Sequence, residues 1–194
     1  MIDIKETLKK LISLPGLSGY EGPAREVIRE SWQPLVDEIT VSPLGSLHAL
    51  KRGSGNEPRP SLLLAAHMDA IGLMVTGIQD SLLRFTQVGG VDPRILPGLK
   101  VIVHGKENLP AVVVQPPDYL LEPSQRGKSV AMEYLFIDTG LEDSELSELV
   151  KIGDLVSFSQ EPLELEGKTV VGHSLDNRIS VAALTYCLQE LQHL

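Results

Sequence analysis

The nine residues Ser61–Asp69, with the sequence SLLLAAHMD, carry the strongest structural signal in the chain. They begin as a short apolar run without polar alternation, which is typical of a strand buried on both faces inside an α/β sheet. The run ends in His67 and Asp69, and residues two apart on an extended chain point the same way. Because open α/β sheets bind ligands at the carboxyl ends of their strands, we predict that both side chains face one site there.

Two interpretations of His67 and Asp69 follow from this placement. In the first, His67 binds a metal ion and Asp69 lies behind it, where it orients the imidazole ring. In the second, a strand simply ends in two polar residues that face water. Short motifs of the form His-x-Asp also arise by chance, so the choice depends on the rest of the chain.

Composition excludes several classes of function. The chain has 194 residues, 42% of them hydrophobic, and a net charge of −9, which leaves no electrostatic footprint for nucleic acid or anionic lipid. The single cysteine, Cys187, cannot form an internal disulfide and fits a reducing compartment. The segment Met1–Glu6 is charged and amphipathic, unlike a secretory signal, and no apolar run approaches the about 20 residues of a membrane span. We therefore expect a cytoplasmic protein.

Local patterns predict helices at both ends of the chain. Asp3 can cap a helix whose apolar residues Ile4, Leu8, Leu11 and Ile12 form one stripe. A second helix is expected from Pro23 to Pro34, and a last one is expected after Asp176. Flanking strands are expected at residues 36–41, 47–50 and 168–172.

The middle of the chain has a different texture. Short β-like runs at 71–76, 82–88, 100–104, 111–115, 134–138 and 154–159 alternate with Gly, Pro and Asp turns, and a short acidic helix is expected at 142–150. Such spacing indicates a small barrel or sandwich. We therefore predict an α/β fold in which residues 1–70 and 164–194 form one domain and residues 71–163 form an all-β insert.

A second polar cluster, Gly172–Arg178 (GHSLDNR), follows the last predicted strand. Alone, Asp176 is most simply read as a helix N-cap. Beside His67 and Asp69 it has another possible role, because a carboxylate that holds two metal ions is the usual bridge in two-metal hydrolases.

Six segments, in the same order along the whole chain, match the sequence motifs of a known group of proteins, which the chain resembles. The matching segments are Ser18–Glu21 (SGYE), Ala66–Val75 (AHMDxIGxMV), Leu96–Gly98 (LPG), Phe136–Gly140 (FIDTG), Ile152–Phe158 (IGDxVxF) and Gly172–Arg178 (GxxLDxR). Together they resemble the co-catalytic binuclear metallo-aminopeptidases. That group includes glutamyl, deblocking and tetrahedral dodecameric aminopeptidases, and some members are labelled endoglucanases.

The resemblance implies a role for each candidate site residue. His67 would bind one metal ion, Asp176 would bridge two ions, zinc or cobalt, and Asp69 would be the catalytic-site carboxylate behind His67. The peptide bond between Asp176 and Asn177 would be cis. The β insert would mediate dimerisation, and dimers would build larger hollow homo-oligomers.

The chain departs from the family pattern in two ways. Ala70 and Asn177 stand where the family often has acidic residues. More importantly, the family's Glu-Glu pair, which supplies the general base and a further ligand, would fall about thirty residues past Asp176, beyond Leu194, as would a further Asp and His. We therefore expect the chain to be the front part of something larger.

Three functions are weighed. The parent function implied by the resemblance is removal of N-terminal residues from peptides, but one His and one Asp cannot hold two dications tightly. Loss of a general base costs about 10²–10⁴ in rate, so the chain alone is expected to be inactive. The alternative is a non-catalytic oligomerisation or binding module. A glycoside hydrolase is disfavoured, because it needs paired carboxylates and an aromatic-lined groove, and aromatic residues make up only 4%.

Overall fold

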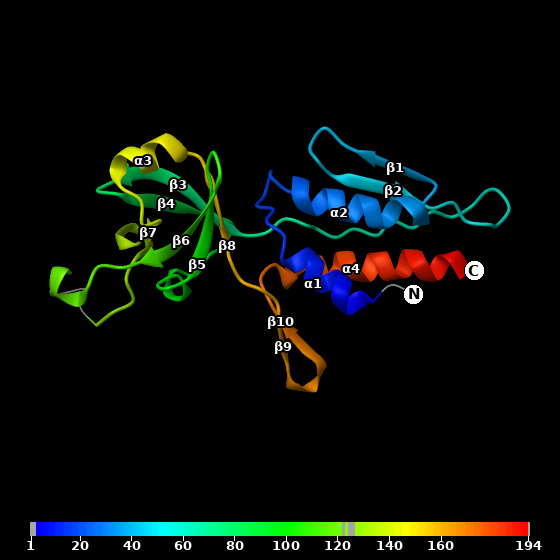
Figure 1. The fold of residues 1–194 in the computed structure, drawn as a ribbon. Helices are drawn as coiled ribbons and strands as arrows, with labels where there is room; N and C mark the ends of the chain where they lie inside the picture. The colour runs from blue at the N-terminus through cyan, green and yellow to red at the C-terminus, as the bar shows by residue number, and fades with distance from the viewer. Residues whose placement is uncertain (1–2, 122, 124–126, 194) are drawn as a thin grey trace. The chain divides into compact units, whose positions relative to one another are not determined.

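The computed structural model describes residues 3–121, 123 and 127–193, and it divides into two compact units. The first unit contains residues 1–70 and 161–194, and the second contains residues 71–160. Figure 1 shows the mainly helical first unit and the β-rich second unit. The mixed α/β class predicted from the sequence is confirmed. Met1, Ile2 and Leu194, which belong to the N-terminal segment and to the chain end considered above, lie outside the described residues.

The first unit combines three helices with two small antiparallel hairpins. The helices are α1 (Ile4–Ile12), α2 (Gly22–Trp32) and α4 (Leu175–Glu190), with short 3-10 turns at Gln33–Leu35, Glu166–Lys168 and Leu191–His193. The hairpins are β1 (Glu38–Val41) with β2 (Leu47–Leu50), and β9 (Leu163–Leu165) with β10 (Thr169–Val171). Helix α1 lies beside α4, and α2 lies beside α4 and β2 (Figure 1).

Helix α1 forms where its sequence predicts it. The Asp3 carboxylate accepts hydrogen bonds from the backbone amides of Lys5 and Glu6, as expected of an N-cap. Three residues of the predicted apolar stripe are buried in a core that also includes side chains of α2 and α4, whereas Ile4 at the start of the helix is exposed. The buried members of this core are Leu8, Leu11, Ile12, Ile28, Val181 and Ala182.

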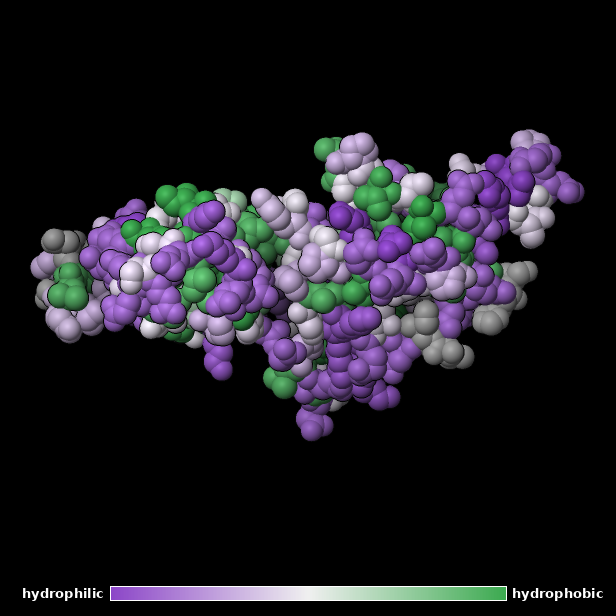
Figure 2. All heavy atoms as spheres, turned by 45° about the horizontal axis from the view of Figure 1, so that its top comes forward, coloured by the Kyte–Doolittle hydropathy of each residue, from purple (hydrophilic) through white to green (hydrophobic). Residues whose placement is uncertain are grey.

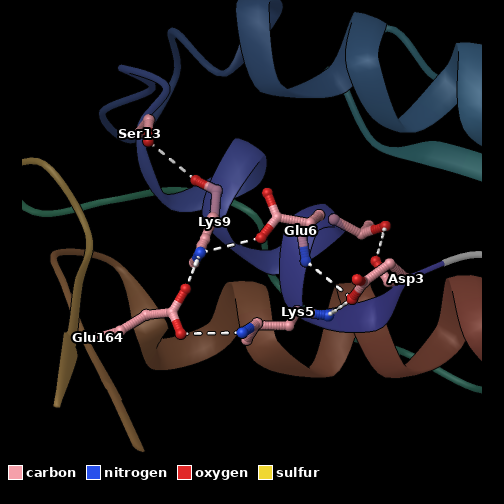
Figure 3. A network of polar contacts seen from close by, with 7 residues as sticks. Asp3, Lys5, Glu6, Lys9, Ser13 and Glu164 are labelled. Carbon is pink, nitrogen blue, oxygen red and sulfur yellow. Dashed lines mark hydrogen bonds and ion pairs between the residues drawn. The ribbon is translucent and has the colours of Figure 1, made fainter. Parts of the chain in front are cut away.

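An ion-pair network fixes the β9–β10 hairpin to α1 (Figure 3). The Glu164 carboxylate accepts hydrogen bonds from Lys5 Nζ, at 2.8 Å, and from Lys9 Nζ. These bonds, Lys5 first and Lys9 second, lower the pKa of Glu164 to about 2. At Gly172, just after β10, a Cβ atom would lie 2.6 Å from Ile12 Cδ1, so glycine permits the close approach of this segment to α1.

The prediction of a buried strand at Ser61–Ala66 is wrong for this structure. Residues 61–69 have no strand assignment, and Leu62 and Leu63 are 84% and 89% exposed. A strand requires neighbours for its backbone N–H and C=O groups, and strands β1 and β2 pair only with each other among the described residues. Figure 2 shows apolar side chains at the surface among polar ones, and exposed leucines of this segment add to that apolar surface.

The second unit is a closed six-stranded barrel, which confirms the sequence prediction of a barrel-like β module. Its strands are β3 (Gly72–Gln79), β4 (Leu82–Val88), β5 (Lys100–His104), β6 (Asn108–Val114), β7 (Phe136–Asp138) and β8 (Leu155–Phe158), in the order β3-β4-β7-β6-β5-β8. All neighbouring strands are antiparallel. Helix α3 (Asp143–Leu149) and 3-10 turns at Pro93–Ile95, Asp118–Leu120 and Met132–Tyr134 complete the unit.

Alternation of side chains along the strands explains why the barrel closes around a dry core. Leu73, Val75, Leu83, Val103 and Ile137 are all almost fully buried and belong to one cluster. Alternate residues of a strand point to opposite faces, so the inward positions of each strand fill the barrel interior.

None of the helices in the described part of the chain has the length and apolar character of a membrane span.

Candidate metal centre

Asp69 contacts His67, and a loop of the first unit packs against the segment that carries both residues. Residue Ala70 forms an isolated parallel bridge with Leu17, and its amide donates to the Gly16 carbonyl at 2.8 Å. This bridge brings Ser18 next to Asp69, and the Ser18 hydroxyl donates a hydrogen bond to Asp69 Oδ2. The other carboxylate oxygen, Oδ1, lies 3.0 Å from His67 Nδ1.

The environment of Asp69 favours its ionised form. The hydrogen bond from Ser18 is the main cause that lowers its pKa, partial burial opposes it, and the contact with His67 lowers it further. An ionised Asp69 favours the tautomer in which His67 Nδ1–H donates a hydrogen bond to it, and in that tautomer the lone pair of Nε2 is free for a cation. The spacing that places His67 and Asp69 on one side of an extended segment therefore leads to direct contact between them.

Asp176 reaches His67 from a segment 109 residues away. Its Oδ1 atom lies 3.1 Å from His67 Nε2, and its side chain is 95% exposed. Asp176 and Asn177 have non-helical backbone angles within the first turn of α4, and the peptide bond between them is cis, as the resemblance implied. The carboxylate thus faces the imidazole rather than serving as the simple helix cap considered above.

This pair fits a divalent cation. When Nδ1 carries the only ring proton, Nε2 and the Asp176 carboxylate oxygen are both acceptors, and they attract each other at 3.1 Å only with a second proton or a cation between them. Zinc binds nitrogen and oxygen ligands at about 2.0–2.2 Å, so two ligands of one tetrahedral ion are about 3.4 Å apart. The observed separation of 3.1 Å is within a few tenths of an ångström of that geometry.

The ligand set is small. Across the described residues, no three His, Cys, Asp or Glu side chains come together as a metal-binding group. His173, which precedes Asp176 by three residues, therefore forms no such trio with His67 and Asp176. His104 lies in the barrel, where its ring contacts Asn108 and Ser157.

A cavity of about 710 Å³ opens beside His67, entirely within the first unit. Apolar side chains of α2, β2, α4 and the segment 63–68 make up much of its wall. His48, which the sequence places in an unrelated segment, also lines this cavity together with Glu21 and Asp69. The candidate metal centre therefore borders an apolar hollow rather than open solvent on every side.

Arg178 is the residue near this site that sequence reasoning missed. It appeared in the sequence only as a motif match, but it is fully buried and donates to backbone carbonyls. Burial lowers its pKa to about 10, against a favourable contribution from Asp69, so it stays positively charged at neutral pH. One signal was available, because a cation in the first turn of a helix opposes the helix dipole and needs another explanation.

The sequence profile of the M42 glutamyl aminopeptidase family matches residues 45–194. The chain belongs to the M42 family. The resemblance drawn from the six motifs is thereby confirmed.

Individual M42 relatives match nearly the whole chain. A putative aminopeptidase of Acetivibrio thermocellus is 36% identical over 192 residues, which cover 98% of this chain and 54% of the relative. The TET aminopeptidase structure from Thaumarchaeota archaeon SCGC AB-539-E09 has a TM-score of 0.90 at 28% identity, and covers 98% of this chain and 54% of that one. A TET1 peptidase of Pyrococcus horikoshii that assembles into a tetrahedron or a large octahedral shell has a TM-score of 0.83 at 38% identity, over 97% and 56%. The chain therefore spans about half the length of the relatives it matches.

Proposed function

We propose that this chain is part of a metal-dependent M42 aminopeptidase that removes N-terminal residues from peptides with two divalent metal ions, zinc or cobalt. The observation that carries the proposal is the 3.1 Å contact between His67 Nε2 and Asp176 Oδ1 across 109 residues of sequence. Membership of the M42 family, whose relatives are aminopeptidases, supports the reaction class.

Each site residue of the chain has a distinct task in this proposal. His67 would bind one ion, Asp176 would bridge both, and Asp69 would keep His67 Nδ1 protonated so that Nε2 faces the ion. When bound, the ions would polarise the scissile carbonyl and lower the pKa of a water molecule. Ser18 would contribute indirectly, because its hydroxyl holds the Asp69 carboxylate.

The 194-residue chain by itself is proposed to be inactive. Its described residues bring together two candidate ligands, whereas catalytic zinc sites use three protein ligands for each ion and keep one position open. No Glu of the described residues joins His67 and Asp176 in a metal-binding group of three. We propose that the general base lies outside this chain. Missing general-base catalysis alone costs about 10²–10⁴ in rate.

An assay on the purified chain tests both statements. Aminoacyl p-nitroanilides are supplied with Mn²⁺, Co²⁺ or Zn²⁺, and metal binding is measured in parallel by isothermal titration calorimetry. We expect weak binding that His67→Ala abolishes, and no turnover. Turnover at ordinary aminopeptidase rates would refute the inactivity of the chain, and binding unaffected by His67→Ala would refute the metal site.

A non-catalytic oligomerisation or binding module is the second candidate. The barrel favours it, because this unit closes its sheet and buries its own core while the ligand set of the first unit is small. Assembly of the P. horikoshii relative into a tetrahedron or a large octahedral shell supports homo-oligomerisation, and we propose that part of the contact is made through the barrel. Size-exclusion chromatography with light scattering decides whether this chain associates without any peptidase activity.

The proposed location is the cytoplasm. Cys187 is a free, exposed thiol, which fits a reducing compartment, and the acidic net charge gives no reason to expect nucleic acid or membrane partners. A fluorescent fusion in cells of the source organism would test this location.

A further inference from the structure

Arg178 joins two segments of the first unit through its guanidinium group. Nε donates to the Met68 carbonyl at 2.9 Å, and Nη1 donates to the carbonyls of Leu11 at 2.6 Å and Leu14 at 2.5 Å. Nη2 donates to the Pro15 carbonyl at 3.4 Å. The side chain is 0% exposed, so all of these contacts are made out of water.

The partners of Arg178 explain how a buried cation is tolerated. Among the described residues its hydrogen bonds go to backbone carbonyls, and no ion pair includes it. Leu11 lies in the last turn of α1, and Leu14 and Pro15 follow the end of the helix, where backbone carbonyls carry partial negative charge. A guanidinium with five donors can satisfy several of them at once.

Glycine at position 16 leaves room for this arrangement. A Cβ atom at Gly16 would lie 2.7 Å from Arg178 Nη2, and the backbone φ of +152° is one that residues with side chains rarely adopt. Gly16 also accepts the hydrogen bond from Ala70 that ends the His67 segment. Gly16 in the loop after α1 therefore contacts both Arg178 and the end of the His67 segment.

The contact with Met68 is the one that concerns the metal centre. Met68 stands between His67 and Asp69, and its carbonyl belongs to the peptide group that joins Met68 to Asp69. Arg178 lies only two residues after Asp176, in the same turn of α4. One side chain therefore ties the backbone that carries His67 and Asp69 to the backbone that carries Asp176.

We propose that Arg178 is the positioning residue of the metal centre, and that it sets the separation of His67 from Asp176 by holding the Met68 carbonyl. The proposal rests on the metal-dependent function proposed above. Arg178 touches neither ion nor substrate in this role. A purely structural arginine would contribute to stability without a specific effect on the His67–Asp176 pair.

The test compares two buried positions of the same helix. Arg178→Lys keeps the charge but cannot reach four carbonyls with a fork of donors. The control, Thr185→Val, removes a buried hydroxyl that accepts from Trp32 Nε1 and donates to the Val181 carbonyl, so it also destabilises the core. Mn²⁺ is titrated into each folded variant, and paramagnetic broadening of the amides at residues 67–69 and 176 is followed by NMR.

We expect the Mn²⁺ concentration for half-maximal broadening to rise at least tenfold in Arg178→Lys and to stay within twofold in Thr185→Val. An unchanged midpoint in Arg178→Lys would overturn the proposal. If Arg178→Lys does not fold, Gly16→Ala, which crowds the guanidinium but keeps its donors, is judged by the same criterion.

A metal-free measurement separates this proposal from the metal proposal. The ring-proton chemical shifts of His67 report its contacts with Asp69 and Asp176 without any ion. We expect them to change in Arg178→Lys or Gly16→Ala and to stay constant in Thr185→Val. If the unmodified chain shows no localised Mn²⁺ broadening, the metal site fails, and the ring shifts alone decide whether Arg178 positions His67; unchanged shifts would refute it.

Discussion

At the scale of single residues, Asp69 is the group whose removal should affect metal binding most specifically. Asp69→Asn removes the carboxylate that accepts from His67 Nδ1, and loss of such a partner typically costs about 10–100-fold in metal affinity. Asp92→Asn is the matched control, because Asp92 belongs to the second unit and its carboxylate pairs there with Arg94. Calorimetric titration with Mn²⁺ checks the difference; equal effects of the two substitutions would show that only net charge matters.

The local sequence predicts that His67 and Asp69 face one site, whereas the approach of Asp176 to them was expected only from the family resemblance. The His67–Asp69 contact follows from alternation along an extended segment. No local pattern predicts that Asp176 lies next to His67, because 109 residues separate them. Only the resemblance to the aminopeptidase family predicted this contact. The roles of Ser18 and Arg178 could not be derived, because hydrogen bonds to a distant carboxylate or carbonyl leave no periodic signal.

At the scale of elements, the β9–β10 hairpin should respond to acid through Glu164. The folded pKa of Glu164, about 2, is below its ordinary value of 4.5, so its stabilising contribution is present above pH 4.5 and is lost as the pH falls towards 2. NMR shifts of the hairpin amides should therefore show a transition in this window. Glu164→Gln should remove it and Glu166→Gln, in the same hairpin, should keep it; a transition that persists in Glu164→Gln would contradict the assignment.

Elements were predicted well where their signals are local. The Asp3 cap and the apolar spacing of α1 lie within one helix, and the turns between barrel strands are marked by Gly and Pro. Ser61–Ala66 has an equally clear strand pattern but no strand partner among the described residues. Apolar composition indicates that a segment prefers to be buried, whereas the hydrogen bonds of a β-strand depend on a neighbouring strand that local sequence does not reveal.

At the scale of the whole molecule, the barrel should unfold independently of the metal centre, because the two units have separate cores. Ile137→Ala opens a cavity at a fully buried position and should cost about 2–5 kcal/mol of barrel stability in urea denaturation. Ile152→Ala, at an exposed position of the same unit, should cost much less. Mn²⁺ affinity should be unchanged in both, and a parallel loss of affinity would show that the units are energetically coupled.

Exposed leucines of the segment 61–66 predict self-association. Contiguous apolar surface of this kind is normally covered, so we expect at least a dimer at micromolar concentration. Leu63→Gln should lower the average mass measured by light scattering, whereas Leu44→Gln, in the β1–β2 turn, should not. A clean monomer for the unmodified chain would contradict the expectation.

The pairing of β3 with β8 has a consequence for engineering. Leu73 lies opposite Val156 on antiparallel neighbours, so the polypeptide enters and leaves the barrel at the same end and on adjacent strands. Residues 71–160 are therefore a continuous insertion whose two ends lie close together. A short linker from Ala70 to Glu161 should suffice to excise it, and barrels of other sizes could be grafted at the same junction.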